Sequence, residues 1–410
     1  MKQFNVVVCG TGCRGATMAQ NVICGIDGVR IVGVCDLYED KAQKCADKIN
    51  EKVGYRPAVY TDVETMLNEL KPDIAYVATS WETHIEVAIQ TMEHGIATAM
   101  EVGGASSEEE CRALIEAKER TGVPFMFMEN CCYNRDELLA LSLVRNGVLG
   151  RVVYCHGAYG HDLRKEVAYG DINRHYRLKH YSNRNCENYP THELGPIARM
   201  LNINRGNRMV SLVARSSAAI SLHEYVQDKP ELEYLHDREF KQGDVVDTLI
   251  TCENGEMISL RLDTMLPRTY SRELTICGTK GRYCQDTNSV FMDGLKENFD
   301  IIMGTKTFLD NATEYYPEHL PDFWLNVTEE TKKKGHGGMD YFLFSAFVNA
   351  LRNGEDMPID VYDAAAWMCI TYLSEKSIAM GGAPVEIPDF TNGAYKTREP
   401  RDVINVIKEK

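Results

Sequence analysis

The 410-residue sequence predicts an α/β protein in which a doubly wound parallel sheet is followed by an α+β domain with an open, mostly antiparallel sheet. Strand-like apolar runs alternate with amphipathic helical stretches over about the first 130 residues. This alternation is typical of a parallel sheet with helices on both faces. A glycine-rich sequence directly follows the first run. After residue 132, alternating polar and apolar residues instead indicate strands with one solvent-facing side.

The expected elements follow this division. In the first part, strands are expected at residues 4–9, 30–35, 59–60, 73–78, 97–102 and 125–128, and helices at 16–25, 37–53, 63–70, 84–95 and 107–122. In the second part, strands are expected at 151–159, 210–218, 245–252, 257–264 and 272–278, and helices at 135–146, 190–201, 341–353 and 361–380. Glu253-Asn-Gly-Glu256 indicates a hairpin turn. The polar and aromatic stretch 160–190 has no regular pattern, and a stretch of this length is often functional.

Composition limits the class of function. The chain has 45 Lys and Arg against 60 Asp and Glu, a formal net charge of −15, which argues against a nucleic-acid partner. Its 14 cysteines form no C-x-x-C pattern, and several lie in apolar runs. We therefore expect reduced thiols and a cytoplasmic location. No secretory signal pattern and no apolar run long enough to span a membrane is found.

A G-x-G-x-x-G motif, formed by Gly10, Thr11, Gly12, Cys13, Arg14 and Gly15, lies between the first strand and the first helix. In this context the glycines allow a tight turn, close approach of a pyrophosphate and close helix packing. Asp36 closes the second strand, where a carboxylate can bind the ribose hydroxyls and repel a 2′-phosphate. The motif therefore predicts a Rossmann domain that prefers NAD. Two alternatives stay open: Arg14 could accommodate a 2′-phosphate, or the turn could be purely structural.

We expect a Rossmann NAD-binding domain at residues 1–131 and an α+β substrate-binding and catalytic domain at residues 132–410. The C-terminal helices either stay with the second domain or pack back on the first. In the second domain, Tyr189 and His192 lie three residues apart at a helix start, which places a phenol and an imidazole on one side. Such a pair suits proton transfer, although a buried His and Tyr can equally stabilise a turn.

Two further segments combine polar side chains with glycine. Tyr159-Gly-His161-Asp-Leu-Arg164 ends a strand, and Gly335-His336-Gly-Gly-Met-Asp340-Tyr341 runs into a helix for which Asp340 is expected to be the N-cap. Tyr270 lies in a comparable polar segment, Asp263 to Arg272. Each segment could also be an ordinary surface loop.

The order of these motifs resembles the Gfo/Idh/MocA family and, within it, glycoside hydrolase family 109. The most specific segments are Tyr189-Pro-Thr-His192 and His336-Gly-Gly-Met-Asp-Tyr341, supported by Glu129-Asn-Cys-Cys-Tyr133, Gly157-Ala-Tyr-Gly-His161 and Asn202-Ile-Asn-Arg-Gly206. Two positions depart from the dehydrogenases of the wider family. Their Glu-Lys-Pro segment is Glu101-Val102-Gly103 here, and their Asp before the active-site His is Asn188. These departures disfavour a simple alcohol dehydrogenase.

The resemblance implies an NAD-dependent glycosidase acting on N-acetylgalactosaminides, with α-linked substrates preferred. Its chemistry would be oxidation at C3, elimination across C1 and C2, addition of water and re-reduction, which differs from the usual two-carboxylate mechanism. The resemblance implies catalytic roles for His192 and Tyr189, substrate contacts for Tyr159, His161, Tyr270 and His336, and cofactor contacts for Thr79, His84, Glu101 and Asn130. It implies no metal, and it leaves open which of Tyr189 and His192 takes the C2 proton.

Three other functions are compatible with the sequence. The chain could be an NAD(P)-dependent sugar dehydrogenase of the wider family, the same glycosidase acting on β-linked substrates, or an NAD-binding sensor without catalysis. Selectivity between galacto and gluco sugars stays open. Because the exposed face of an open sheet commonly pairs with another subunit, we also expect a homodimer.

Overall fold

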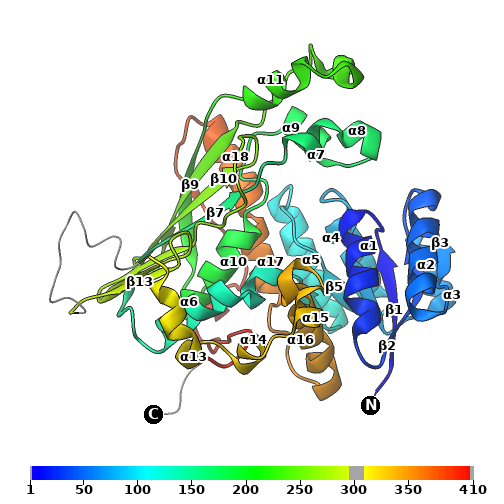
Figure 1. Cartoon of the computed structure of the whole chain (residues 1–410), viewed down its shortest axis with the longest axis horizontal. Coiled ribbons are helices and arrows are strands. Elements are labelled where there is room, and N and C mark those ends of the chain that lie inside the picture. Colours follow the sequence, from blue (N-terminus) through cyan, green and yellow to red (C-terminus); the bar gives the residue numbers. More distant parts are fainter. Residues whose placement is uncertain (1, 295–308, 407–410) are drawn as a thin grey trace. The chain divides into compact units, whose positions relative to one another are not determined.

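The computed structural model describes residues 2–294 and 309–406 of the chain (Figure 1). The chain forms two compact units. The first contains Met1–Tyr133 and Asn326–Ala365, and the second contains Asn134–Leu325 and Ala366–Lys410. The chain therefore leaves the first unit after residue 133 and returns to it for about forty residues before it ends in the second.

The first unit contains a six-stranded parallel sheet, which confirms the predicted doubly wound architecture. The strand order is β3-β2-β1-β4-β5-β6, so the direction of winding reverses between β1 and β4. In sheets of this kind, ligands bind outside the carboxyl ends of the strands at the reversal. The strands are β1 (Phe4–Cys9), β2 (Val29–Cys35), β3 (Ala58–Tyr60), β4 (Ile74–Val77), β5 (Ala97–Met100) and β6 (Phe125–Phe127).

The connecting helices of this unit begin and end where the sequence provides caps. The Ser107 side chain accepts a hydrogen bond from the Glu110 N–H at the start of α5, and Asp62 accepts one from the Thr65 N–H at the start of α3. Gly122 ends α5 in the left-handed conformation. The helices are α1 (Cys13–Asn21), α2 (Glu39–Val53), α3 (Val63–Leu70), α4 (His84–Glu93) and α5 (Glu108–Thr121), with short 3-10 turns η1 (Ile23–Gly25) and η2 (Asn130–Tyr133).

The returning segment packs against the β4 to β6 half of this sheet. The Phe344 ring lies edge-on to Tyr76 of β4, with 6.1 Å between the ring centroids. The Ile359 carbonyl accepts a hydrogen bond of 3.0 Å from the Phe127 N–H of β6. The segment contains α15 (Glu329–Lys332), η5 (His336–Gly338), α16 (Met339–Asn353) and the start of α17 (Val361–Met368).

The second unit contains an eight-stranded sheet of order β13-β12-β11-β7-β10-β9-β8-β14. Its pairs are antiparallel except for β7 with β10, as expected for an open, mostly antiparallel sheet. The predicted hairpin turn at residues 253–256 joins β9 to β10, and Gly255 supplies a φ of +95°. The strands are β7 (Val152–Gly160), β8 (Met209–Ser216), β9 (Val245–Cys252), β10 (Met257–Asp263), β11 (Thr275–Gly278), β12 (Gly281–Cys284), β13 (Ser289–Met292) and β14 (Val385–Glu386).

Helices of this unit pack on one side of the sheet (Figure 1). α10 (Thr191–Met200) approaches β7 so closely that a Cβ on Gly157 would lie 2.7 Å from the Glu193 Cβ. α18 (Ile370–Ala379) is joined to β8 by a 2.9 Å hydrogen bond from the Ala214 N–H to the Ser377 hydroxyl. The remaining helical segments are α6 (Arg135–Arg145), α11 (Ser221–Gln227), η3 (Pro230–Leu235), η4 (Asn311–Tyr315), α13 (Tyr316–His319), α14 (Asp322–Leu325) and η6 (Ala394–Lys396).

Three details differ from the sequence-based expectation. The stretch 160–190 contains the short helices α7 (Arg164–Ala168), α8 (Gly170–Asn173) and α9 (Arg177–Asn183), each too short to show a clear helical period. The helix expected at residues 361–380 is divided into α17 and α18 at Cys369. The sequence also did not indicate β12 and β13. In residues 2–294 and 309–406, no helix is long and apolar enough to cross a membrane.

Candidate functional site

The glycine-rich loop connects β1 to α1, and its three glycines meet different surroundings. Gly10 has a φ of +90°, and a Cβ there would lie 2.4 Å from the Ala78 carbonyl oxygen. A Cβ on Gly15 would lie 1.8 Å from the Gly10 carbonyl oxygen, whereas a Cβ on Gly12 would meet nothing within 4 Å. The first and third glycines therefore permit the loop to pack, and the space beside Gly12 is open to a ligand.

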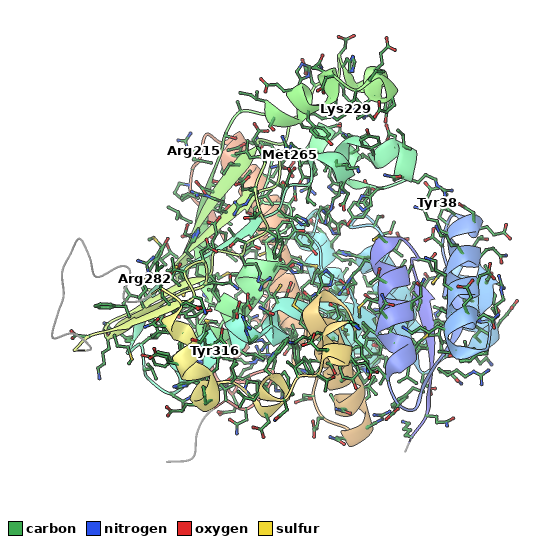
Figure 2. The ribbon with its side chains drawn as sticks, viewed as in Figure 1. Tyr38, Arg215, Lys229, Met265, Arg282 and Tyr316 are labelled. Carbon is green, nitrogen blue, oxygen red and sulfur yellow. The ribbon has the colours of Figure 1, made fainter. Side chains whose placement is uncertain are left out.

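Asp36 follows β2 and is fixed beside this loop. Its Oδ2 accepts hydrogen bonds from the Thr11 N–H at 2.7 Å and from the Thr11 hydroxyl at 3.1 Å. Its Oδ1 accepts one of 3.0 Å from the N–H of Tyr38, the residue labelled before α2 in Figure 2. Because an ionised carboxylate has about four acceptor positions, these three donors leave room for a ligand hydroxyl. Leu37 next to it is 80% exposed and offers an apolar surface.

Arg14 points toward the other half of the sheet. Its guanidinium lies 2.8 Å from a Glu101 oxygen, directly after β5, and 2.8 Å from an Asp340 oxygen in the first turn of α16. β5 and β2 lie on opposite sides of β1, so the Arg14 charge is directed away from Asp36. Two carboxylates also neutralise it. Arg14 is therefore poorly placed to accommodate a phosphate on the ribose that Asp36 would bind.

Asp340 connects the returning segment to the loop, a role that the sequence did not suggest. The expected N-cap role is wrong, because Gly338 occupies that position and no side chain caps α16. Instead, the buried Asp340 carboxylate accepts hydrogen bonds from Arg14, from Asn130 Nδ2 at 2.7 Å and from His336 Nδ1 at 2.7 Å. Burial alone would raise the pKa of Asp340, but the Arg14 guanidinium and the His336 imidazole hold that pKa well below its ordinary range.

The other residues expected at the cofactor lie along the same edge of the sheet. Thr79 follows β4, and its buried Oγ1 has no hydrogen-bond partner among the residues that the structure describes. His84 is buried at the start of α4, and Cys13 is exposed at the start of α1. An unpaired buried hydroxyl is costly without a ligand. Together with the open space at Gly12, it fits a dinucleotide bound by the loop and by the ends of β2, β4 and β5.

Gly103 is packed against two aromatic rings of this edge. A Cβ at this position would lie 2.4 Å from the His84 ring and 2.5 Å from the Trp81 ring. Both rings are buried. The departure from a proline at this position therefore has a steric reason, since no side chain fits beside Trp81 and His84 as they stand.

In the second unit, Tyr189 and His192 form the predicted pair at the start of α10. The Tyr189 hydroxyl lies 3.3 Å from His192 Nε2, and the ring centroids are 4.8 Å apart. Tyr189 directly precedes Pro190, the N-cap residue of α10, and His192 is the second residue of the helix, so both side chains lie at the helix start. The pair therefore has the contact that proton exchange between a phenol and an imidazole requires.

Tyr159, at the end of β7, lies at the centre of an aromatic cluster with this pair. Its ring centroid is 4.6 Å from Tyr189, 5.6 Å from His192, 5.7 Å from His161 and 6.2 Å from Tyr270. Burial raises the pKa of the Tyr159 phenol well above its ordinary value, so it stays protonated at neutral pH. Burial and the nearby Arg177 lower the pKa of His161. Three of the four residues expected at the sugar, Tyr159, His161 and Tyr270, thus lie with the catalytic pair, whereas His336 belongs to the first unit.

Arg177 is a member of this cluster that the sequence analysis did not identify. This buried side chain places its guanidinium 5.4 Å from the Tyr189 ring centroid and 2.9 Å from Glu166. It comes from the polar stretch 160–190, whose composition was the available signal. On the opposite side, Arg272 donates a 3.1 Å hydrogen bond to the Tyr270 hydroxyl and is itself paired with buried Glu137. The cluster therefore contains two fixed cations beside its tyrosines.

Glu187 lies two residues before Tyr189 and is completely buried. Its Oε1 accepts a hydrogen bond of 3.4 Å from the Tyr189 N–H, and its Oε2 has no hydrogen-bond partner in the described part of the chain. Burial raises the pKa of Glu187 to about 8. The side chain is therefore a neutral carboxylic acid at neutral pH, in contact with the backbone of the Tyr189 turn.

This protonation gives stability a defined pH dependence. The pKa of Glu187 is raised in the folded state. The contribution of protonated Glu187 to the free energy of unfolding is therefore complete below the unfolded-state pKa of about 4.3, and it is lost as the pH rises through about 8. In Glu187→Gln, which cannot ionise, the free energy of unfolding relative to wild type should rise by on the order of 1–3 kcal/mol between pH 5 and pH 9. Urea unfolding of both proteins at pH 5 and at pH 9 measures this difference in the free energy of unfolding. Glu224→Gln, at an exposed carboxylate on α11, is the control, and an unchanged difference between pH 5 and pH 9 for Glu187→Gln would contradict the assignment.

Two family models match the chain. Residues 4–129 match the oxidoreductase family with an NAD-binding Rossmann fold, and residues 133–397 match the C-terminal domain of glycosyl hydrolase 109. An alpha-N-acetylgalactosaminidase of Tannerella forsythia is 36% identical over 95% of this chain and 87% of its own length. An alpha-N-acetylgalactosaminidase of Bacteroides fragilis is 36% identical over 94% of this chain and 92% of its own length.

Solved structures with the same fold are more distant in sequence. Myo-inositol 2-dehydrogenase from Lactobacillus plantarum aligns with a TM-score of 0.66 at 15% identity, covering 94% of this chain and 100% of that one. Scyllo-inositol dehydrogenase from Lactobacillus casei, solved with NAD(H) and scyllo-inositol, aligns with a TM-score of 0.65 at 14% identity, covering 94% and 99%. At these identities the alignments establish the fold.

Proposed function

The chain belongs to glycoside hydrolase family 109, and on this basis we propose that it is an NAD-dependent glycosidase that hydrolyses terminal α-linked N-acetylgalactosaminides. The main support for this proposal is the Tyr189–His192 pair within the aromatic cluster. The pair can transfer protons, and the neighbouring aromatic rings offer faces on which a sugar can pack. The reaction would proceed by oxidation at C3, elimination across C1 and C2, addition of water and re-reduction. We assign cofactor binding to residues 1–131 together with the returning segment 326–365, and sugar binding to the rest of residues 132–410.

The first unit would hold the cofactor through its backbone and a few side chains. The start of α1, which no side chain caps among the residues that the structure describes, presents its N–H groups beside the open space at Gly12, and this arrangement suits a pyrophosphate. Asp36 would accept hydrogen bonds from a ribose diol, and Thr79, His84, Glu101 and Asn130 would line the remaining edge. Bound NAD⁺ would supply a reversible hydride acceptor for C3 of the sugar.

NAD rather than NADP is supported by charge. A 2′-phosphate next to Asp36 would place two negative groups together. The nearest basic side chain of the loop, Arg14, is held by Glu101 and Asp340 on the other side of β1. The loop therefore offers no spare cation for that phosphate in the part of the chain that the structure describes.

The second unit would bind the sugar and move its protons. Tyr159 stays a neutral phenol and can donate a hydrogen bond to a sugar hydroxyl, and Tyr270, held by Arg272, presents a half-exposed ring. His161, with its lowered pKa, is neutral and contacts the Tyr159 hydroxyl at 3.2 Å. Tyr189 Oη and His192 Nε2 would hold and exchange the protons of C2 and of the C3 hydroxyl.

The fate of the C2 hydrogen tests the mechanism. Turnover of a nitrophenyl α-N-acetylgalactosaminide in heavy water should place deuterium at C2 of the released sugar, because elimination removes that hydrogen and solvent replaces it. The C3 hydrogen should be retained, because the same cofactor returns it. Mass spectrometry and proton NMR of the product measure both positions. Full turnover with hydrogen retained at C2 would exclude elimination, and accumulation of NADH instead of aglycone would favour a sugar dehydrogenase.

The roles of the pair are tested by Tyr189→Phe and His192→Ala. Each should lower turnover by about 10²- to 10⁴-fold, the usual contribution of a general acid or base. NAD⁺ affinity, measured by calorimetry, should not change. Tyr169→Phe, which removes a phenol bonded to Glu231 instead of to this cluster, is the matched control and should retain activity. Full activity in both test variants would make the pair structural.

We also propose a homodimer formed through the uncovered face of the second sheet. Figure 1 shows helices on one side of this sheet only, among the residues that the structure describes. Leu249 and Met257 on β9 and β10 are 42% and 43% exposed, and Val213 of β8 is in register with Leu249. Exposed apolar side chains on the uncovered face of an open sheet are compatible with a subunit interface.

Sedimentation velocity tests this assembly. Wild type should sediment with twice the mass of the chain, and Leu249→Glu should shift it toward the monomer because a carboxylate would be buried at the interface. Met380→Glu, at a 48% exposed position after α18, should leave the mass unchanged. A wild-type monomer at micromolar concentration would contradict the proposal.

A further inference from the structure

The charges beside the glycine loop do not balance. Arg14 contributes one positive charge, and Glu101 and Asp340 contribute two negative charges, so the sum is 1 − 2 = −1. Both carboxylates are buried, and Tyr76 donates its hydroxyl to Glu101 without adding charge. A bound pyrophosphate would bring further negative charge to this loop. A nearby positive group would offset that repulsion.

His336 is the group in contact with this cluster that can supply the charge. Its Nδ1 lies 2.7 Å from Asp340 Oδ2 and 3.2 Å from an Arg14 nitrogen. Its side chain is 54% exposed, and in residues 2–294 and 309–406 no hydrogen bond involves its Nε2. With Nδ1 directed at the carboxylate, Nε2 is the atom that a ligand can reach.

The backbone around His336 is held in an unusual conformation. His336 itself has a φ of +40°, in the left-handed region that disfavours side chains, and Gly335, Gly337 and Gly338 also have positive φ values. A Cβ on Gly335 would lie 2.4 Å from Asp340 Oδ2, so glycine is required for the loop to fold over that carboxylate. A histidine retained in such a conformation points to a functional contact.

We propose that His336 is a cofactor-binding residue whose imidazolium donates from Nδ1 to Asp340 and from Nε2 to the pyrophosphate of the dinucleotide at the glycine loop. Its charge brings the cluster from −1 to zero. The inference rests on the proposed function only in taking NAD as the ligand. The family resemblance led us to expect that His336 contacts the sugar. The inference differs from that expectation, because the His336 side chain contacts Arg14 of the glycine loop.

A ligand series separates the pyrophosphate from the rest of the cofactor. Full-length protein freed of nucleotide is titrated by calorimetry with NAD⁺, ADP-ribose and adenosine. In His336→Gln, affinity for NAD⁺ and for ADP-ribose should fall about 5- to 20-fold, in the range of a lost charged hydrogen bond. Affinity for adenosine, which has no phosphate, should not change. His336→Lys restores a cation at the same position and should recover most of the ADP-ribose affinity.

His94→Gln is the matched control. His94 pairs with Glu64 at 3.1 Å in the same unit, but it lies just before the amino end of β5, whereas the glycine loop lies at the carboxyl ends of the strands. It should leave all three affinities unchanged. Unchanged ADP-ribose affinity in His336→Gln would overturn the inference, and so would an equal loss for adenosine. A higher KM for the glycoside with normal ADP-ribose affinity would overturn it in favour of a sugar contact. Failure of the wild type to bind NAD⁺ would instead refute the proposed function.

Discussion

The ion pairs of the partly buried Arg14 with two buried carboxylates hold together the part of the molecule that would bind the cofactor. One guanidinium connects the glycine loop to the end of β5, 87 positions later in the sequence, and to the start of α16, 326 positions later. Removing one partner of a buried pair leaves an uncompensated charge, which typically costs several kcal/mol. The geometry of the loop therefore depends on a segment that the chain supplies only near its end. This dependence explains why the first unit is not continuous in sequence.

The candidate sugar-binding cluster depends on a different constraint, the close approach of a helix to a strand. α10 packs against β7 at Gly157, where any side chain would meet Glu193, and this contact brings the first turn of α10 next to the end of β7. Tyr159 and Tyr189 can then lie 4.6 Å apart. The buried Arg177 lies over the Tyr189 ring, and the buried Arg272 donates a hydrogen bond to the Tyr270 hydroxyl. A set of aromatic rings with fixed donors suits a ligand with apolar ring faces and many hydroxyl groups.

Much of the fold could be predicted from local sequence, because apolar periodicity and glycine position report directly on strands and tight turns. The loop at Gly10 and the carboxylate of Asp36 were recognisable in this way, and the Tyr189–His192 pair was recognisable from its three-residue spacing at a helix start and from the family resemblance. The connection from Asp340 to Arg14 was not, because an ion pair across more than 300 residues leaves no local pattern. Arg177 was missed for a related reason, since its helix has only seven residues. Local rules assigned Asp340 to a helix cap, and long-range charge pairing determined its actual position.

The packing at Gly103 constrains how this enzyme could change over evolutionary time. Because His84 and Trp81 occupy the volume that a side chain at residue 103 would need, substitutions at these three positions are epistatic. A change at 103 alone would displace two buried rings, and a change at 81 or 84 alone would open a cavity. Mutational paths between this loop and one containing proline must therefore pass through a particular order of steps, with the aromatic residues altered first. Directed-evolution libraries aimed at the cofactor edge would reach new sequences more readily if they varied all three codons together.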